Sequence, residues 1–196
     1  MTFNRYKKAR FVCYHSTKMM KFVSVIQVIL AVVSYYHVIQ AKVTVTKFEN
    51  CDPNANYPIK MMFKLKQGSD GVQVLEEGSL STKVPLGNDI LDIADVSYKE
   101  DNGAYEHLIT IKENLCDAVN KYMGEFMHDI QEAAGLERGK CPVPPGDYKI
   151  KDHVLDFQKF KFKKMPDGEF LAKVSLLDAK TNETLNCHNL EFTVEK

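Results

Sequence analysis

The feature that most constrains the fold of this chain is an alternation of apolar and polar residues with a period of two. Successive side chains of a β-strand point to opposite faces of the sheet, so such an alternation predicts a strand with one buried face. The clearest case is residues 59–66, where the apolar positions are Ile59, Met61, Phe63 and Leu65 and the others are mostly lysine. Residues 170–177 and 190–195 repeat the pattern, and weaker strands are expected at 43–48, 72–75, 90–98 and 105–111.

Turn signals separate these runs. Asp70-Gly71, Asn102-Gly103 and Asp167-Gly168 each supply a glycine that accepts the positive φ of a tight hairpin. Short strands joined by such turns favour an antiparallel β-sandwich or β-cup. We therefore expect one mainly β domain.

One segment, residues 113–134, has a helical period instead. Its apolar residues recur at spacings of three and four, at Leu115, Val119, Tyr122, Phe126 and Ile130, with Met123 and Met127 beside them. This spacing predicts a single amphipathic helix. Gly135 is suited to end it in the left-handed conformation.

The amino terminus has the layout of a secretory signal peptide. Residues 22–36 are almost wholly apolar, Lys21 precedes them and Ala41 follows. A run of about 15 residues is shorter than the roughly 20 that a membrane-spanning helix needs, although a signal-anchor is the alternative. We expect residues 1–41 to be a leader that begins at Met19 or Met20, and residues 42–196 to form the secreted domain.

Removing the leader changes the charge. Its 41 residues hold six of the 26 basic residues and none of the acidic ones, so Lys42–Lys196 has 20 basic against 26 acidic residues. A net charge of −6 argues against nucleic acid as a partner, because phosphates require a basic face. It also argues against attachment to an anionic membrane by charge alone.

Four cysteines remain after the leader: Cys51, Cys116, Cys141 and Cys187. An even number behind a signal peptide indicates two disulfides, for which three connectivities are possible. No CxxC or HxxxH pattern is present, so no metal site is expected. Asn182-Glu183-Thr184 is a glycosylation sequon.

A search for catalytic motifs finds none. The sequence has no GxSxG, no glycine-rich phosphate loop and no HExxH, and the histidines after the leader are scattered. We therefore expect neither an enzyme nor a cofactor. The chain is instead rich in large, adaptable apolar residues, including Met61, Met62 and Phe63, which would form either an ordinary core or a cavity between sheet and helix.

The carboxyl half carries a resemblance to a known family. Cys141-Pro142 precedes a Gly146-Asp147-Tyr148 strand, Gly168 begins a later strand, and Cys187 lies ahead of the last one. Together with Asn50-Cys51-Asp52 and Leu115-Cys116-Asp117, this order resembles the lysosomal ganglioside activator protein and related insect secreted chemosensory proteins. These have the ML-like lipid-recognition β-cup. The resemblance covers most of residues 48–194.

The resemblance implies the pairs Cys51–Cys187 and Cys116–Cys141, and a β-cup with an apolar cavity for a lipid or another hydrophobic molecule. Two of the activator's four disulfides have no counterpart here, and those help to shape the mouth of the activator's cavity. An extracellular carrier of the insect type, which takes part in chemosensation, therefore suits the sequence better than ganglioside presentation. A membrane surface or a receptor is a possible further partner.

Our hypothesis is a secreted, non-catalytic carrier whose ligand is held between the strand at 59–66 and the helix. The rival is an extracellular protein-interaction module with a filled core, and a third alternative is a lipid-modifying enzyme. The expected ligand-binding residues are Ile59, Met61, Phe63, Leu65, Val119, Met123, Phe126 and Met127.

Overall fold

The computed structural model describes residues 42–68, 72–161 and 165–195. The described residues belong to the second of the chain's two units, Gln40–Lys196. The expected leader and the Asp70-Gly71 turn lie outside the described residues. Within them, no helix is both long and apolar enough to cross a lipid bilayer.

The larger of two antiparallel sheets has five strands in the order β1-β8-β7-β4-β5. Its inner face carries the alternating apolar residues expected for β7, of which Phe170, Ala172 and Leu176 are buried. The strands are β1 (Lys42–Asn50), β4 (Ile90–Lys99), β5 (Tyr105–Asn114), β7 (Gly168–Asp178) and β8 (Thr184–Glu195).

The smaller sheet has three strands in the order β2-β3-β6: β2 (Ile59–Gln67), β3 (Gln73–Thr82) and β6 (Gly146–Leu155). In β2 the even positions from Lys60 to Lys66 are exposed and the odd ones are buried or half-buried, as the alternation predicted. β6 was expected only from the resemblance. Its alternation is interrupted at Asp152, which has a φ of 50°.

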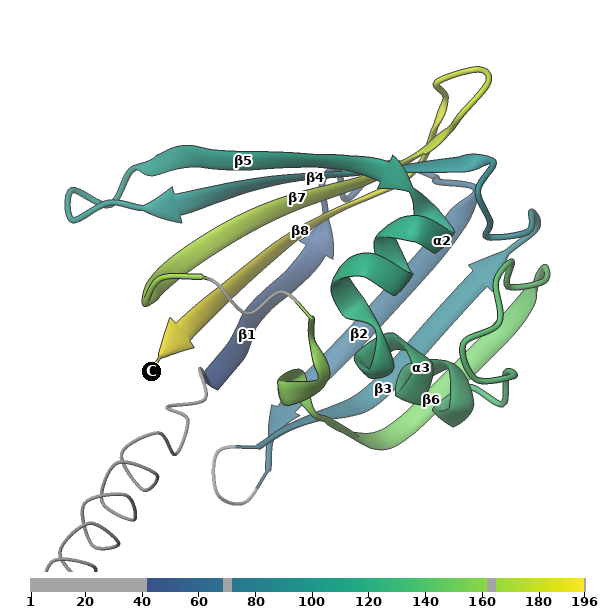
Figure 1. Ribbon diagram of the computed structural model, residues 1–196, viewed down its shortest axis with the longest axis horizontal. Helices are drawn as coiled ribbons and strands as arrows, with labels where there is room; N and C mark the ends of the chain where they lie inside the picture. The colour runs from purple at the N-terminus through teal and green to yellow at the C-terminus, as the bar shows by residue number, and fades with distance from the viewer. Residues whose placement is uncertain (1–41, 69–71, 162–164, 196) are drawn as a thin grey trace, which may run out of the picture. The chain divides into compact units, whose positions relative to one another are not determined.

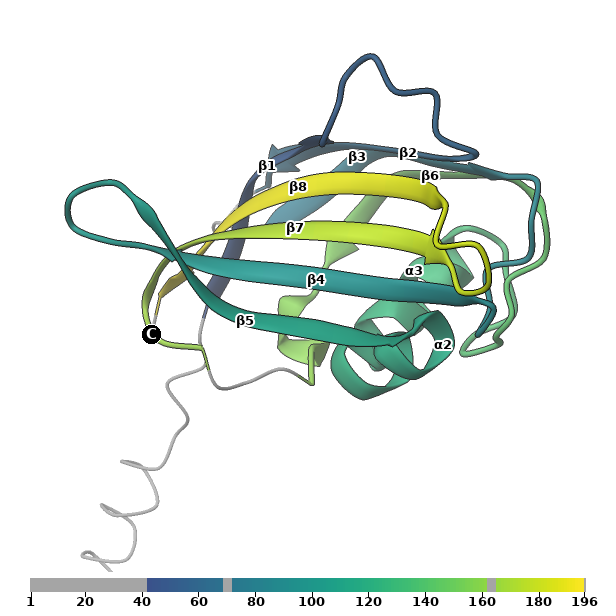
Figure 2. The ribbon, with the colours of Figure 1, turned by 90° about the horizontal axis from the view of Figure 1, so that it is seen from above.

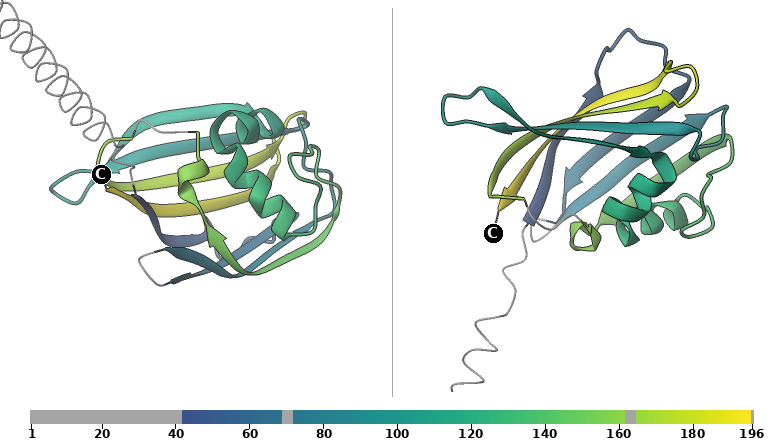
Figure 3. Two further views of the ribbon diagram at one scale, coloured as in Figure 1. Left: turned by 60° about the horizontal axis from the view of Figure 1, so that its bottom comes forward. Right: turned by 45° about the horizontal axis from the view of Figure 1, so that its top comes forward.

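The two sheets form the layers of a cup. Figure 1 shows β1, at one edge of the larger sheet, running beside β2, at one edge of the smaller sheet, and Figure 2 shows the larger sheet from above. The helical segment after β5 lies across the opposite side, under the larger sheet and over the smaller one, as Figure 3 also shows. The expected mainly β, antiparallel, disulfide-stapled cup is confirmed.

The helical segment differs from the single helix expected over residues 113–134. It consists of α2 (Leu115–Ala118), a π-helical turn η2 (Val119–Met123) and α3 (Glu125–Ala133). Gly124 separates the last two with a φ of 53°, and a Cβ there would lie 2.6 Å from Cε of Lys161. The helix is broken at Gly124, where the N–H of Lys161 bonds to the carbonyl of Tyr122, a long-range contact that periodicity could not show. Glu113 belongs to β5.

The carboxyl end of α3 is as expected. Gly135 has a φ of 75°, its N–H bonds to the carbonyl of Glu132, and the N–H of Leu136 bonds to the carbonyl of Gln131. This is the Schellman arrangement, which satisfies the last carbonyls of a helix. The buried Gln131 side chain also bonds to the backbone of Gly139 and Lys140, and so positions the loop that leads to Cys141.

Both disulfides implied by the resemblance are present. Cys51–Cys187 joins the end of β1 to β8, and Cys116–Cys141 joins α2 to the loop before β6. The two bonds span 136 and 25 residues of sequence. The first therefore closes nearly the whole domain, and the second secures the helical segment.

Gly168 does not form the hairpin turn expected at Asp167-Gly168. It begins β7, with a φ of 146°, after the connection from η3 (Phe157–Lys159). A Cβ at this position would lie 2.4 Å from Cε2 of Tyr98. The glycine is needed for close approach of β7 to β4 rather than for a turn. Asn102-Gly103, in contrast, lies in the β4–β5 hairpin, with a φ of 82° at Gly103.

The interior contains three apolar clusters of buried residues. We call them the packed cluster (Ile59, Leu86, Ile90, Leu176 and Leu185), the large-sheet cluster (Val96, Phe170, Ala172, Phe192 and Val194) and the aromatic cluster (Leu75, Phe126, Ile150 and Leu155). Half-buried side chains extend each cluster. Phe63, Leu65, Met123, Phe157 and Phe160 pack against the aromatic cluster, which lies between the smaller sheet and α3.

Candidate functional site

Two buried polar side chains of β8 join the larger sheet to β2. The amide of Asn186 donates to the carbonyl of Ile59 at 2.8 Å, and its Oδ1 lies 2.5 Å from Nδ1 of His188. The other ring nitrogen of His188 lies 3.3 Å from the carbonyl of Met61. The carbonyls of Ile59 and Met61 therefore bond to side chains of β8. Along this part of β2, the edge that faces the larger sheet is not paired with another strand.

Gln73 makes a second connection, from β3 to β1. Its Nε2 donates to the carbonyl of Val45 at 2.7 Å, and its Oε1 accepts from the N–H of Val45 at 2.7 Å. The side chain is only 5% exposed. Gln73 thus completes the hydrogen bonding of a β1 residue that would otherwise face an open edge, since buried backbone groups must be paired.

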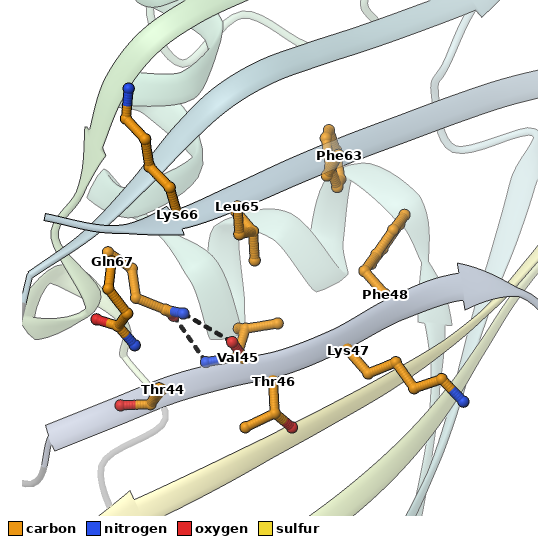
Figure 4. Close-up of a pocket in the computed structure, with 10 residues that line it drawn as sticks. Thr44, Val45, Thr46, Lys47, Phe48, Phe63, Leu65, Lys66 and Gln67 are labelled. Atoms are coloured by element: carbon orange, nitrogen blue, oxygen red, sulfur yellow. Dashed lines mark hydrogen bonds between the residues drawn. The ribbon is translucent and has the colours of Figure 1, made fainter.

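A pocket of about 360 Å³ lies between β1 and β2 (Figure 4). We call it the edge pocket, because the facing edges of the two sheets form its walls. Figure 4 shows Phe48 and Leu65 extending into the gap. The lining residues are Thr44, Val45, Thr46, Lys47, Phe48, Phe63, Leu65, Lys66, Gln67 and Gln73.

Aromatic rings form one side of the edge pocket. The Phe48 ring lies 4.7 Å from the Phe63 ring, centroid to centroid, and stacks on His188 at 4.4 Å. Phe63 and Leu65 also pack against the aromatic cluster. Phe63 and Leu65 therefore belong both to the wall of the edge pocket and to the apolar packing between the smaller sheet and α3.

The charged groups at the edge pocket are already paired. Nζ of Lys47 lies 2.6 Å from Glu49 and 3.5 Å from Glu191, and Nζ of Lys66 lies 2.7 Å from Asp152. Figure 4 shows both lysine side chains extending away from the gap. These carboxylates raise the pKa of each lysine, so both ammonium groups stay charged.

Among the described residues, burial is the main cause of a pKa shift at two titratable side chains, Asp92 and His188. Burial raises the pKa of Asp92 to about 6, and its Oδ1 is buried without a hydrogen-bond partner. Burial also lowers the pKa of His188, which the Met61 carbonyl partly opposes. Asp92 lies on the inner face of β4, opposite Glu113 of β5 and Leu176 of β7, and is not part of the edge pocket.

The eight residues predicted to bind a ligand fall into three places. Phe63, Leu65, Met123 and Phe126 meet in or against the aromatic cluster, so that strand and helix face each other there. Ile59 is fully buried in the packed cluster, and Met61 packs against it. Val119 and Met127 are half-buried, and neither packs against any of the three clusters of described residues.

The contribution of β1 to the pocket was not predicted from the sequence. Only Phe63 and Leu65 of the predicted residues line it, whereas five lining residues belong to 44–48. The weak alternation at 43–48, ending in Phe48, was the one available signal. It could not show which strand of the other sheet would lie opposite.

Two further predictions concern glycosylation and metal binding. Asn182 is exposed in the β7–β8 turn, with a φ of 58°, which leaves its side chain accessible for glycosylation. The described residues contain no group of three or more histidine, cysteine or acidic side chains that could hold a metal ion.

Comparisons with known proteins bear on the family. Residues 94–172 match the model of a family described as "Protein of unknown function (DUF1091)", an ML-like domain family. The match covers less than half of the chain, and it supports the ML-like resemblance drawn from the cysteines and glycines. No curated protein sequence matches the chain.

A structural comparison finds the crystal structure of chicken MD-1 complexed with lipid IVa. The two are 15% identical, and the alignment covers 81% of this chain and 92% of MD-1, with a TM-score of 0.33. A likeness at that score is too slight to carry the ligand of MD-1 over to this chain.

Proposed function

We propose that this protein is a secreted, non-catalytic carrier that binds a lipid or another hydrophobic molecule in the edge pocket and the apolar surface behind it. The observation that carries the proposal is the gap between β1 and β2, lined by Val45, Phe48, Phe63 and Leu65. Ligand sites are typically concave, mostly apolar and bounded by a few polar groups. Each buried CH₂ of a ligand would contribute about 0.8 kcal/mol.

The surroundings of the pocket favour uptake of an apolar chain. Phe63 and Leu65 connect the mouth to the aromatic cluster, where Met123 and the Phe157 and Phe160 rings are half-buried. Methionine and half-buried aromatic side chains can adjust to a flexible apolar partner. Delivery of a chemosensory ligand would be one use of such a carrier.

Export is part of the proposal. A leader that ends at Ala41, two disulfides and an accessible Asn182 are all expected of a secreted glycoprotein. Amino-terminal sequencing of protein from culture medium should then begin near Lys42, and glycosidase treatment should lower its mass. Extracellular protein that begins at Met1 or Met19 would contradict the leader.

The binding proposal is tested by filling the edge pocket. Gln67 lines the pocket, is exposed and extends toward β1 in Figure 4, so Gln67→Trp should block the pocket with a loss of stability below about 1 kcal/mol. We expect uptake of a fluorescent apolar probe by the wild type and at least a tenfold weaker uptake by the variant. Thr181→Trp, in the exposed β7–β8 turn, is the matched control and should bind the probe as the wild type does.

The second candidate is a protein-interaction module with a filled core. It is favoured by residues 105–110 of the edge strand β5, which are all exposed and include Tyr105, Leu108 and Ile109. Exposed apolar residues on an edge strand often mark a contact surface. If the wild type takes up no apolar probe, this reading replaces the carrier.

A further inference from the structure

The edge pocket also indicates what kind of ligand it would hold. We infer that its ligand is a single-chain amphiphile with an uncharged, hydrogen-bonding head group, such as an alcohol or an amide. The inference rests on the proposed carrier function and specifies its substrate class. Three observations carry it: the charges at the mouth, the backbone edge of β2 and the size of the pocket.

The charges at the mouth do not favour an anionic head group. The cations that line the pocket, Lys47 and Lys66, are bonded to Glu49, Glu191 and Asp152. Three carboxylates thus accompany two ammonium groups, a local net charge of −1. A carboxylate or phosphate head would have to displace one of these partners and would meet the others as like charges.

The backbone of β2 offers a neutral head group both a donor and an acceptor. Ile59 and Met61 present their carbonyls away from β3 and toward β8. Alternate residues of an antiparallel strand present their backbone groups to the same side, and the β2–β3 register is unbroken through Phe63. The N–H and C=O of Phe63 therefore point toward β1, where no described backbone or side-chain group pairs with them.

Uncharged polar side chains complete this environment. Thr44, Thr46 and Gln67 also line the pocket, whereas Phe48 and Leu65 supply the apolar wall. A hydroxyl or amide can donate to a carbonyl and accept from an N–H at once, and an apolar chain can follow the wall inward. A carboxylate can only accept, so it would leave the Phe63 carbonyl unpaired.

The size of the pocket favours one chain over several. A volume of about 360 Å³ lies near the lower end of the range of about 300–1,000 Å³ for small-molecule sites. On the side of the pocket next to the packed cluster, the hydrogen bonds of Asn186 and His188 to β2 hold the two sheets together. On the other side, Gln73 crosses between the sheets. A ligand with two or more acyl chains would have to break one of these connections.

The test measures displacement of a fluorescent apolar probe by three ligands of equal chain length, tetradecanol, tetradecanamide and tetradecanoate, at a pH where the acid is ionised. We expect the alcohol and the amide to bind about fivefold more tightly than the carboxylate, which corresponds to one like charge near the mouth. A diacyl phosphatidylcholine should not displace the probe.

A pair of charge variants tests the cause of this preference. Asp152→Asn releases Lys66 at the pocket and should improve binding of the carboxylate about threefold while leaving the alcohol unchanged. Glu169→Gln releases Lys99, which is not part of the pocket, and should change neither. The control separates a local effect from a change in net charge.

The possible outcomes distinguish this inference from the carrier proposal. If the wild type binds neither the probe nor any of the three ligands, the carrier proposal fails. If it binds tetradecanoate as tightly as tetradecanol, or if the diacyl lipid displaces the probe, the carrier stands and the ligand class is wrong. An equal response of the two charge variants would also overturn the role assigned to Lys66.

Discussion

Ile59 and Phe63 lie on the same face of the same strand, yet they meet opposite surroundings. Ile59 is fully buried in the packed cluster, among side chains from the loop before β4, from β4, β7 and β8. Four residues later, Phe63 is half-buried and lines the edge pocket. One regular alternation thus contributes both to a filled core and to a gap in the wall of the cup.

The difference follows from what joins the sheets at each position. Beside Ile59, Asn186 reaches the β2 backbone directly and brings the sheets together. Beyond Met61 along β2, no described backbone hydrogen bond joins β2 to β1. The next connection between the two sheets is the hydrogen bond between Val45 and the side chain of Gln73. A pattern of apolar residues therefore guarantees a face toward the interior but does not determine whether that interior is filled.

The largest expected effect concerns the disulfides, which secure the two regions differently. In the chain-entropy model, loss of Cys51–Cys187 would cost about 5 kcal/mol and loss of Cys116–Cys141 about 3.5 kcal/mol. Paired Cys→Ser variants should show this order in denaturant unfolding. The first bond holds β1, which forms one wall of the edge pocket, so its loss should also weaken probe binding. A larger stability loss for the second pair would contradict this assignment.

The comparison within β2 predicts a separation of stability from binding. Ile59→Ala should cost about 4 kcal/mol, because it leaves a cavity in the packed cluster, and should leave probe affinity unchanged. Leu65→Ala, at the half-buried pocket wall, should cost about 2 kcal/mol and weaken the probe severalfold. Thermal melts and probe titration on both variants provide the measurement. Similar probe affinities for the two variants would remove the distinction between the regions.

A smaller effect is expected from the buried carboxyl of Asp92. The folded pKa of Asp92, about 6, lies above the ordinary value of 3.8. Between these two pH values the folded state keeps a proton that the unfolded state has lost. This contribution to stability is fully present below about pH 4 and is lost as the pH rises through about 6, a change of about 3 kcal/mol. Asp92→Asn should therefore stabilise the domain at neutral pH by up to that amount.

Unfolding measured between pH 4 and pH 8 checks this expectation. The Asp92→Asn variant should show a flatter pH dependence than the wild type. Asp101→Asn, in the exposed β4–β5 turn, is the control for removal of one carboxylate and should retain the wild-type slope. An unchanged slope for Asp92→Asn would show that Oδ1 finds a partner in solution.

Much of the strand structure followed from the sequence. The alternations at 59–66, 90–98 and 170–177 mark β2, β4 and β7, since one face of each strand must be apolar to be buried. β6 was less visible, because Asp152 shifts its alternation partway along. The helix was located but not its break at Gly124, where the distant Lys161 lies close.

The candidate site was predictable only in part. Periodicity placed Phe63 and Leu65 on the interior face, and the structure adds that they meet Met123 and Phe126 in the aromatic cluster. The β1 wall, the stacking of Phe48 on His188 and the bonds of Gln73 to Val45 were not foreseen. Each depends on strands that are distant in sequence and belong to different sheets.

The sequence by itself determined the class of fold: period-two apolar residues require sheets and four cysteines allow two disulfides, while the acidic charge of residues 42–196 argues against nucleic acid as a partner. Only the tertiary structure decided where two sheet edges stand apart and which side chains span the gap. Apolar burial is non-directional and can be satisfied by many arrangements. The hydrogen bonds of Asn186, His188 and Gln73 are directional, and they fix how the sheets meet once the chain is folded.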